Sequence, residues 1–141
     1  MFMMTEKHIR LYLKLLFFGV LLSLLAGCTQ EGDDDFSLPR DKYIGSWLCQ
    51  DDDGAGYYAT ITSGTSSIEV VINNYFNLRG TVTAIVTEAT ITVNKQEMKG
   101  IPGTFWCEGG GSLYSRNGKY TIEWKKYAAG DEERTSIYTK Q

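Results

Sequence analysis

The sequence predicts an all-β protein, a small antiparallel meander β-barrel of eight or nine strands that follows a cleaved lipoprotein signal peptide. From about residue 41 the chain is rich in Thr, Tyr, Val, Ile and Gly and shows short alternating runs split by turn residues. The connections are short and no helical apolar stripe lies between them, so neighbouring strands should pair antiparallel. Closing the sheet removes its exposed edges, which favours a barrel over the alternative of a two-sheet sandwich.

The first 27 residues are organised as a secretory signal peptide. Met1–Lys14 is basic, and residues 15–26 form a 12-residue apolar core. A membrane span needs about 20 residues, so the alternative of a tilted transmembrane anchor is disfavoured. The following Leu25-Ala26-Gly27-Cys28 looks like a bacterial lipobox, in which signal peptidase II cleaves before the cysteine and its thiol carries a diacylglycerol. We therefore expect Cys28 to be lipidated and to anchor the protein to a membrane.

Residues 28–40 are expected to form an acidic tether behind the lipid. Thr29–Asp35 is polar and has no hydrophobic pattern, which is typical of a solvated spacer. Acidic residues at this place also resemble the export signal of surface-displayed lipoproteins in Bacteroidetes. Thr29 departs from the aspartate that retains lipoproteins at the inner membrane of enteric bacteria. These features predict an outer-membrane location, on the periplasmic or the cell-surface face.

Residues 41–141 form the predicted barrel domain. Strands are expected near residues 44–50, 57–63, 67–73, 80–87, 89–96, 103–108, 111–116, 119–127 and 134–140. Asn117-Gly118 suits the positive φ angles of a type I′ turn and should join the two strands around it. Alternation places Val82, Ala84 and Val86 on a dry face, and Tyr120, Ile122 and Trp124 on another.

The charge and the histidine content exclude several functions. Removing the three basic residues and the one acidic residue of positions 1–27 leaves 11 basic and 16 acidic side chains, a net charge of −5. A nucleic-acid partner is not expected for such an acidic domain. The only histidine, His8, lies in the leader, so Ser-His or Cys-His catalysis and His-ligated metals are not expected in the mature chain. We predict no catalytic residues, no metal site and no cofactor.

The two cysteines that remain after lipidation are predicted to form a disulfide. Cys49 and Cys107 are the only other thiols in the sequence, and the envelope outside the inner membrane permits oxidation. The alternative is two separate buried thiols.

Three other groups of residues were weighed as sites. Asp51-Asp52-Asp53 precedes Gly54 in a hairpin loop and could attract calcium, but a solvated turn is favoured because the spacing does not fit an EF-hand. Gly109-Gly110-Gly111 lacks the residues of a P-loop and is expected to be a bulge or a loop between strands. Glu108 and Glu123 could act as a carboxylate pair, although nothing in their spacing singles them out.

Aromatic residues are the remaining signal. The mature chain has 14 of them, including Trp47, Trp106 and Trp124, which are the candidate contacts for a ligand or partner. The same residues could fill a narrow barrel, and a filled core is favoured over a ligand pocket. Trp106 is out of phase with Phe105 and Cys107, so we expect it to be exposed, whereas Trp124 should be buried.

Short motifs resemble lipocalin-like barrels. Gly45-Ser46-Trp47, within Tyr43–Trp47, looks like the Gly-x-Trp opening of that fold, in which the tryptophan packs across the closed end of the barrel. Further stretches, among them Tyr58–Thr62 and Val71–Phe76, are similar to small lipocalin-like β-barrel lipoproteins of Bacteroidetes. The resemblance implies an arginine of the last strand against Trp47, for which Arg134 is the only candidate.

Together these observations predict a non-enzymatic outer-membrane lipoprotein. Its lipocalin-like barrel would bind a small apolar ligand or a protein partner, and its lipid anchor would hold it to the membrane. The alternative is a protein-binding envelope inhibitor of lysozyme or of a protease, with the acidic loop of Asp51–Asp53 or Glu108–Gly111 as its anchor. An enzyme is the third hypothesis.

Overall fold

The computed structural model describes residues 37–128 and 132–141, which belong to one folded unit. The leader, Cys28 and the tether up to residue 36 lie outside the described residues. A short 3-10 helix, η1 (Pro39–Lys42), precedes eight strands. The strands are β1 (Gly45–Asp51), β2 (Gly56–Ser63), β3 (Glu69–Tyr75), β4 (Gly80–Val86), β5 (Thr90–Lys99), β6 (Thr104–Arg116), β7 (Lys119–Ala128) and β8 (Glu132–Lys140).

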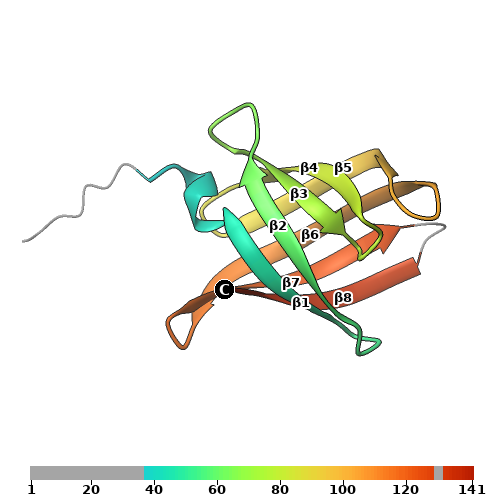
Figure 1. The fold of residues 1–141 in the computed structure, drawn as a ribbon. Helices are drawn as coiled ribbons and strands as arrows, with labels where there is room; N and C mark the ends of the chain where they lie inside the picture. Colours follow the sequence, from blue (N-terminus) through green and yellow to red (C-terminus); the bar gives the residue numbers. More distant parts are fainter. Residues whose placement is uncertain (1–36, 129–131) are drawn as a thin grey trace, which may run out of the picture. The chain divides into compact units, whose positions relative to one another are not determined.

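The strands form a closed antiparallel barrel in sequence order (Figure 1). Each strand pairs with its neighbours along the chain, and β1 pairs with β8 to close the circle. The predicted meander barrel is therefore confirmed, and the sandwich alternative is wrong. Antiparallel neighbours need only short hairpin connections, which is what the sequence provides.

The predicted loop at Gly109-Gly110-Gly111 is wrong, because these residues lie in the middle of β6. They pair on one side with residues 91–93 of β5 and on the other with residues 124–126 of β7. Glycine is needed there for packing: a Cβ on Gly109 would collide with the Tyr75 hydroxyl, and one on Gly111 would lie 2.7 Å from Ile122. Two predicted strands are thus one, and the barrel has eight strands.

Side-chain alternation places the core as the sequence predicts, except at the start of β7. Ile122 and Trp124 are buried, but the prediction for Tyr120 is wrong, because Tyr120 is 38% exposed beside the β6–β7 turn and the neighbouring Thr121 is buried instead. In β4, Val82, Ala84 and Val86 are buried and the residues between them are exposed. Asn117 and Gly118 both have positive φ angles, 53° and 74°, so the predicted type I′ turn between β6 and β7 is confirmed.

The interior of the barrel is filled by large side chains. The largest of the fully buried side chains are Trp47, Trp124, Tyr43, Tyr75, Tyr138, Lys126, Ile61, Ile72, Ile91 and Met98. A Cβ added to Gly80 would lie 2.5 Å from the Met98 sulfur, so the packing leaves no room at that point either.

The segment before β1 covers one end of the barrel. Trp47 is fully buried there, and its indole N–H donates to the Tyr43 carbonyl at 2.7 Å. Gly45 has a φ of +139°, a backbone conformation that glycine adopts readily and that turns the chain into β1. Gly45 therefore turns the chain into β1, and Trp47 fills the covered end of the barrel.

The basic residue beside Trp47 is Lys140, and the expectation for Arg134 is wrong. The Lys140 ammonium lies 5.9 Å from the centre of the Trp47 ring and donates to the Lys42 carbonyl at 2.8 Å. Register explains the difference, because Trp47 pairs with Lys140, whereas Arg134 is six residues away along β8. The next residue, Gln141, donates its backbone N–H to the Ser46 carbonyl at 3.0 Å.

The predicted disulfide is not formed, since Cys49 and Cys107 are both free and buried. Cys49 lies on β1 and Cys107 on β6, with β7 and β8 between them in the closed sheet. Three inter-strand steps of about 4.8 Å along the barrel wall separate the two backbones, which places them out of reach of a bond that needs Cα atoms within about 7 Å. The Cys107 thiol points instead to the Gln96 carbonyl, at 3.6 Å.

Candidate functional site

A buried ion pair lies inside the barrel near the end that carries the β1–β2, β3–β4 and β7–β8 connections. We call this the distal end, because η1 covers the opposite one. The Lys126 ammonium lies 2.9 Å from Asp51 Oδ1, and both side chains are almost fully buried. Lys126 comes from the end of β7 and Asp51 from the end of β1, so the pair joins strands that are not neighbours in the barrel.

Two hydroxyl groups bond one oxygen of the Asp51 carboxylate, Oδ1, while the other, Oδ2, is buried without a hydrogen bond among the described residues. The Tyr57 hydroxyl donates to Asp51 Oδ1 at 3.3 Å, and the Ser136 hydroxyl donates to the same oxygen. Arg134 Nη1 lies 3.6 Å from the other oxygen, Oδ2. Lys126 also donates to the Tyr57 hydroxyl. A charge buried this deeply is tolerated only with such partners.

Four aromatic rings surround the ammonium group. Its nitrogen lies 4.9 Å from the ring centre of Phe76, 5.1 Å from Tyr57, 5.3 Å from Tyr138 and 6.0 Å from Tyr75. These distances permit cation–π attraction, which is strongest where the cation has lost its water. We call Lys126 with these four rings the aromatic box.

The β3–β4 connection holds one ring of the box by an uncommon backbone conformation. Phe76 has a φ of 59°, and Asn74, Asn77 and Arg79 also have positive φ angles. Asparagine tolerates this region, but it is costly for a phenylalanine, so the surrounding contacts must maintain it. The Asn74 side chain contributes, because its amide donates to the Tyr58 carbonyl at 2.7 Å and its oxygen accepts the Arg79 N–H at 2.9 Å.

Burial shifts the pKa values of the titratable groups in the aromatic box. Burial lowers the pKa of Lys126, while the hydrogen bond and the charge of Asp51 act against that shift. Burial also raises the pKa values of Tyr57, Tyr75 and Tyr138 well above the usual range. The Lys126 side chain has no exposed surface, and aromatic rings enclose its ammonium group. The box therefore connects β7 to β1 through the ion pair and does not present an amine that a substrate could reach.

The carboxylates of the β1–β2 loop are all engaged within the protein. Asp52 accepts hydrogen bonds from the Thr135 N–H and hydroxyl, at 3.1 and 3.0 Å, which lower its pKa. Asp53 accepts from the Ala55 N–H at 2.9 Å and from Arg134. Asp51 and Asp53 thus share Arg134, whereas Asp52 turns toward Thr135. Among the described residues no group of three or more His, Cys, Asp or Glu side chains is placed to hold a metal ion.

The other predicted carboxylate pair is not brought together. Glu123 of β7 pairs with Ser112 of β6. Glu108 lies four residues from Ser112 in the same strand, which separates the two carboxylate positions by about 13 Å. Glu123 accepts a hydrogen bond from the Tyr114 hydroxyl at 2.7 Å.

The three tryptophans divide between core and surface as the alternation predicts. Trp47 is fully buried at the covered end, and Trp124 is 2% exposed and packs against Tyr75 and Tyr138. Trp106 is 60% exposed on the outward face of β6. Of the three, only Trp106 is placed to contact a partner.

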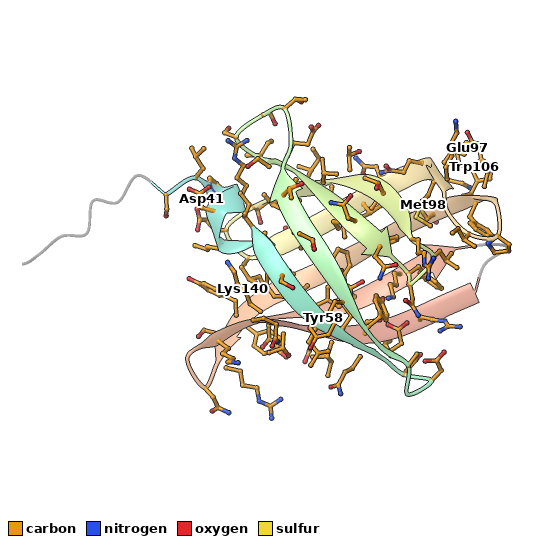
Figure 2. The ribbon with its side chains drawn as sticks, viewed as in Figure 1. Asp41, Tyr58, Glu97, Met98, Trp106 and Lys140 are labelled. Carbon is orange, nitrogen blue, oxygen red and sulfur yellow. The ribbon has the colours of Figure 1, made fainter. Side chains whose placement is uncertain are left out.

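Trp106 belongs to a hairpin that is fixed to the barrel. It pairs with Glu97 of β5, and the next pair is Met98 with Phe105, whose side chains face the core. Ile101, at the tip, is 59% exposed, although its backbone N–H donates to the Leu78 carbonyl at 2.7 Å. Figure 2 shows Trp106 and Glu97 at one end of the barrel and Asp41 of η1 at the other.

The aromatic box was missed at the level of sequence, although a signal for it exists. Lys126 continues the dry face of Ile122 and Trp124, and Asp51 continues that of Trp47 and Cys49. Two opposite charges that fall on inward positions of different strands indicate a buried pair.

The fold and site define a closed eight-stranded antiparallel meander barrel with a filled interior and an internal ion pair. Comparisons with protein-family models, with curated proteins and with solved structures found no match. Among the described residues no helix has the length and apolar character of a membrane span.

Proposed function

We propose that the chain is a non-enzymatic lipoprotein of the outer membrane, anchored through Cys28, whose barrel serves as a rigid scaffold for binding a protein partner. The lipobox-like Leu25–Cys28 and the acidic residues behind it support the anchor and the location. The observation that carries the binding role is Trp106, a large aromatic ring left 60% exposed on a hairpin that the core holds in place.

The exposed ring suits a partner interface. Tryptophan is enriched among the residues that carry most of the energy at protein interfaces, because its large ring buries much surface and has few rotamers to lose. Ile101 adds apolar surface on the same hairpin. The hairpin lies at the end opposite η1, through which the chain enters the barrel.

A small apolar ligand inside the barrel has less support. The inward positions that would line a cup are occupied by Trp47, Trp124 and the aromatic box. Such a ligand would have to displace packed rings or the ion pair, and both changes are costly. These costs favour binding on the outer surface over binding inside the barrel.

The envelope inhibitor is a special form of partner binding, and its proposed acidic anchors are weakened by the contacts of the loop. The carboxylates of Asp51, Asp52 and Asp53 already have partners within the barrel. An inhibitory contact through Trp106 stays compatible with the proposal.

Site-specific photocrosslinking in living cells tests this function. A photoreactive amino acid would replace Trp106 in the full-length chain, and Tyr58 in a matched control, because Tyr58 is an equally exposed aromatic, 61%, on the outer face of β2. Illumination should attach one discrete protein through position 106 and not through position 58. The adduct should disappear when Ile101 is also changed to Ser, since that variant keeps the fold but removes apolar surface.

Two results would contradict the proposal. One is the absence of any adduct at position 106 in cells that export and lipidate the variant normally. The other is the same mixture of adducts from positions 106 and 58, which would mean random collision and not a specific interface.

A further inference from the structure

The outer wall of the barrel carries a groove that crosses five neighbouring strands, β5, β6, β7, β8 and β1. Its volume is about 960 Å³, at the upper end of the range of roughly 300–1,000 Å³ for small-molecule sites. It does not include Trp106 or the hairpin tip, so it is separate from the partner surface proposed above. Most of the residues that line the groove point outward, and inward residues of the same strands also border it, namely Asp51, Ile91, Gly111, Trp124 and Ser136.

The strand register explains the shape of the groove. One outward row runs across the strands through Thr92, Gly110, Lys125, Thr135 and Asp52, which are successive cross-strand neighbours. A second outward row, two residues along each strand, runs parallel to it. Outward residues two apart in a strand are separated by about 6.6 Å, and four inter-strand steps span about 19 Å. The two rows therefore cover an area that is longer across the strands than along them.

The second row carries the same kind of chemistry. It consists of Thr90, Ser112, Glu123, Ile137 and Gln50. Within the part of the chain that the structure describes, the hydroxyls of Thr92 and Ser112 and the amide of Gln50 make no hydrogen bond to the protein. These groups can both donate and accept hydrogen bonds, so they are available to a ligand.

The charges of the groove select against a charged ligand. Two carboxylates, Asp52 and Glu123, stand within it together with the amine of Lys125. An anionic ligand would meet the carboxylates and a cationic ligand the amine, both at close range. A ligand with many hydroxyl groups avoids this conflict, because each hydroxyl can accept from the amine or donate to a carboxylate oxygen. Asp52 Oδ2 and Glu123 Oε1 already accept hydrogen bonds from Thr135 and Tyr114, so the ligand would use the other oxygen of each carboxylate.

Gly110 leaves a gap in the first row. A Cβ placed on it would meet no atom within 4 Å, so packing does not explain this glycine, unlike Gly109 and Gly111 on either side. The missing side chain lets a flat molecule approach the backbone of β6 between Thr92 and Lys125. Glycine in a strand interior weakens the strand, and close approach by a ligand is one reason for its presence.

We propose that this groove binds an uncharged oligosaccharide, with Gly110 as the point of closest approach and the hydroxyl, amide and carboxylate groups of the two rows as its hydrogen-bonding partners. The groove, whose two rows extend farther across the strands than along them, fits an extended chain of sugar rings. Its walls combine polar groups with a larger apolar area, and sugar rings likewise carry hydroxyls on their edges and apolar C–H groups on their faces.

The test is a titration of the full-length chain in detergent micelles, labelled with ¹⁵N, with maltotetraose, cellotetraose, xylotetraose and mannotetraose as probes. At least one sugar should shift the backbone amides of the two rows in a saturable manner and leave those of the Trp106 hairpin unchanged. Gly110→Val should weaken that binding at least roughly ten-fold, about 1.4 kcal/mol, by filling the gap. Valine suits a strand, and the open space around Gly110 lets the barrel fold.

Gly103→Val is the matched control, because a Cβ at Gly103 also meets nothing within 4 Å but lies outside the groove. Thermal unfolding should show both variants folded, and the control should bind as the parent chain does. The proposal is overturned if none of the four sugars shifts the two rows, or if Gly110→Val binds as tightly as the control. It is equally overturned if an uncharged Gly-Ser hexapeptide shifts the same amides more strongly than any sugar.

Discussion

Replacing Lys126 by methionine should destabilise the barrel by about 3 to 4 kcal/mol. Methionine has nearly the same length but no charge, so the Asp51 carboxylate would stay buried without its cation. Removing one partner of a fully buried pair costs about 3–5 kcal/mol. Both side chains are at most 1% exposed and their charged atoms are 2.9 Å apart, which makes this a fully desolvated pair. Arg134, 3.6 Å from the other Asp51 oxygen, keeps some compensation and favours the lower half of the range.

Removing both charges should cost less than removing one. In the double variant Asp51→Leu with Lys126→Met, no unpaired charge remains inside the barrel, and the rings of the aromatic box can pack on apolar atoms. The hydroxyls of Tyr57 and Ser136 lose their acceptor, at about 1 kcal/mol each. We expect a loss of about 2 kcal/mol, smaller than that of either single variant.

Urea unfolding of the full-length chain in detergent measures these free energies. Circular dichroism follows the sheet, and fluorescence follows Trp124, which packs against Tyr138 of the box. Lys125→Met is the matched control, since the neighbouring Lys125 side chain is 70% exposed and its loss should cost no more than about 0.5 kcal/mol. Additive losses in the double variant, or equal losses from Lys125 and Lys126, would refute the reasoning.

Three further predictions concern the anchor, the tryptophans and the thiols. Cys28→Ser should abolish labelling by an alkyne fatty acid and leave unprocessed precursor on a gel; normal labelling would remove the anchor from the proposed function. Trp47→Ala should cost about 3–5 kcal/mol in urea unfolding, whereas Trp106→Ala should change stability by less than about 1 kcal/mol, and comparable losses would contradict the assigned positions. Burial raises the pKa of Cys49 to about 12 and that of Cys107 to about 11, so the folded thiols keep protons that the unfolded chain releases above pH 9. Stability should therefore fall as the pH rises from about 9 to 11, by up to about 1.4 kcal/mol per pH unit for each thiol, and the fall should be correspondingly shallower when both are changed to alanine.

Much of the fold could be predicted because the barrel is built from local signals. Alternation placed the dry faces of β4 and, from Ile122 on, of β7, and Asn117-Gly118 located a hairpin, since these patterns depend on residues close together in the chain. The glycine run of β6 misled the prediction, because glycine is a turn signal unless a neighbour fills the space above it. That neighbour, Tyr75, lies on β3 and is invisible in the local sequence.

The long-range contacts could not be predicted in the same way. The disulfide hypothesis counted thiols but could not see that β7 and β8 separate Cys49 from Cys107. The partner of Trp47 depended on the β1–β8 register, which pairs it with Lys140. The ion pair of Asp51 and Lys126 likewise required the closure of the barrel, although the inward phase of both residues was readable beforehand.

The way β1 is held has a mechanical consequence. This first strand pairs along its length with both β2 and β8, and the last residues of the chain, Lys140 and Gln141, are bonded back to Lys42 and Ser46. A pull on Ser37 along the direction of β1 would load two ladders of hydrogen bonds in shear, so they would have to fail together and not one at a time. Resistance to such a pull is governed by the rate of unfolding and not by the equilibrium stability. A barrel held this way resists being unravelled from its first strand when it is pulled from that end.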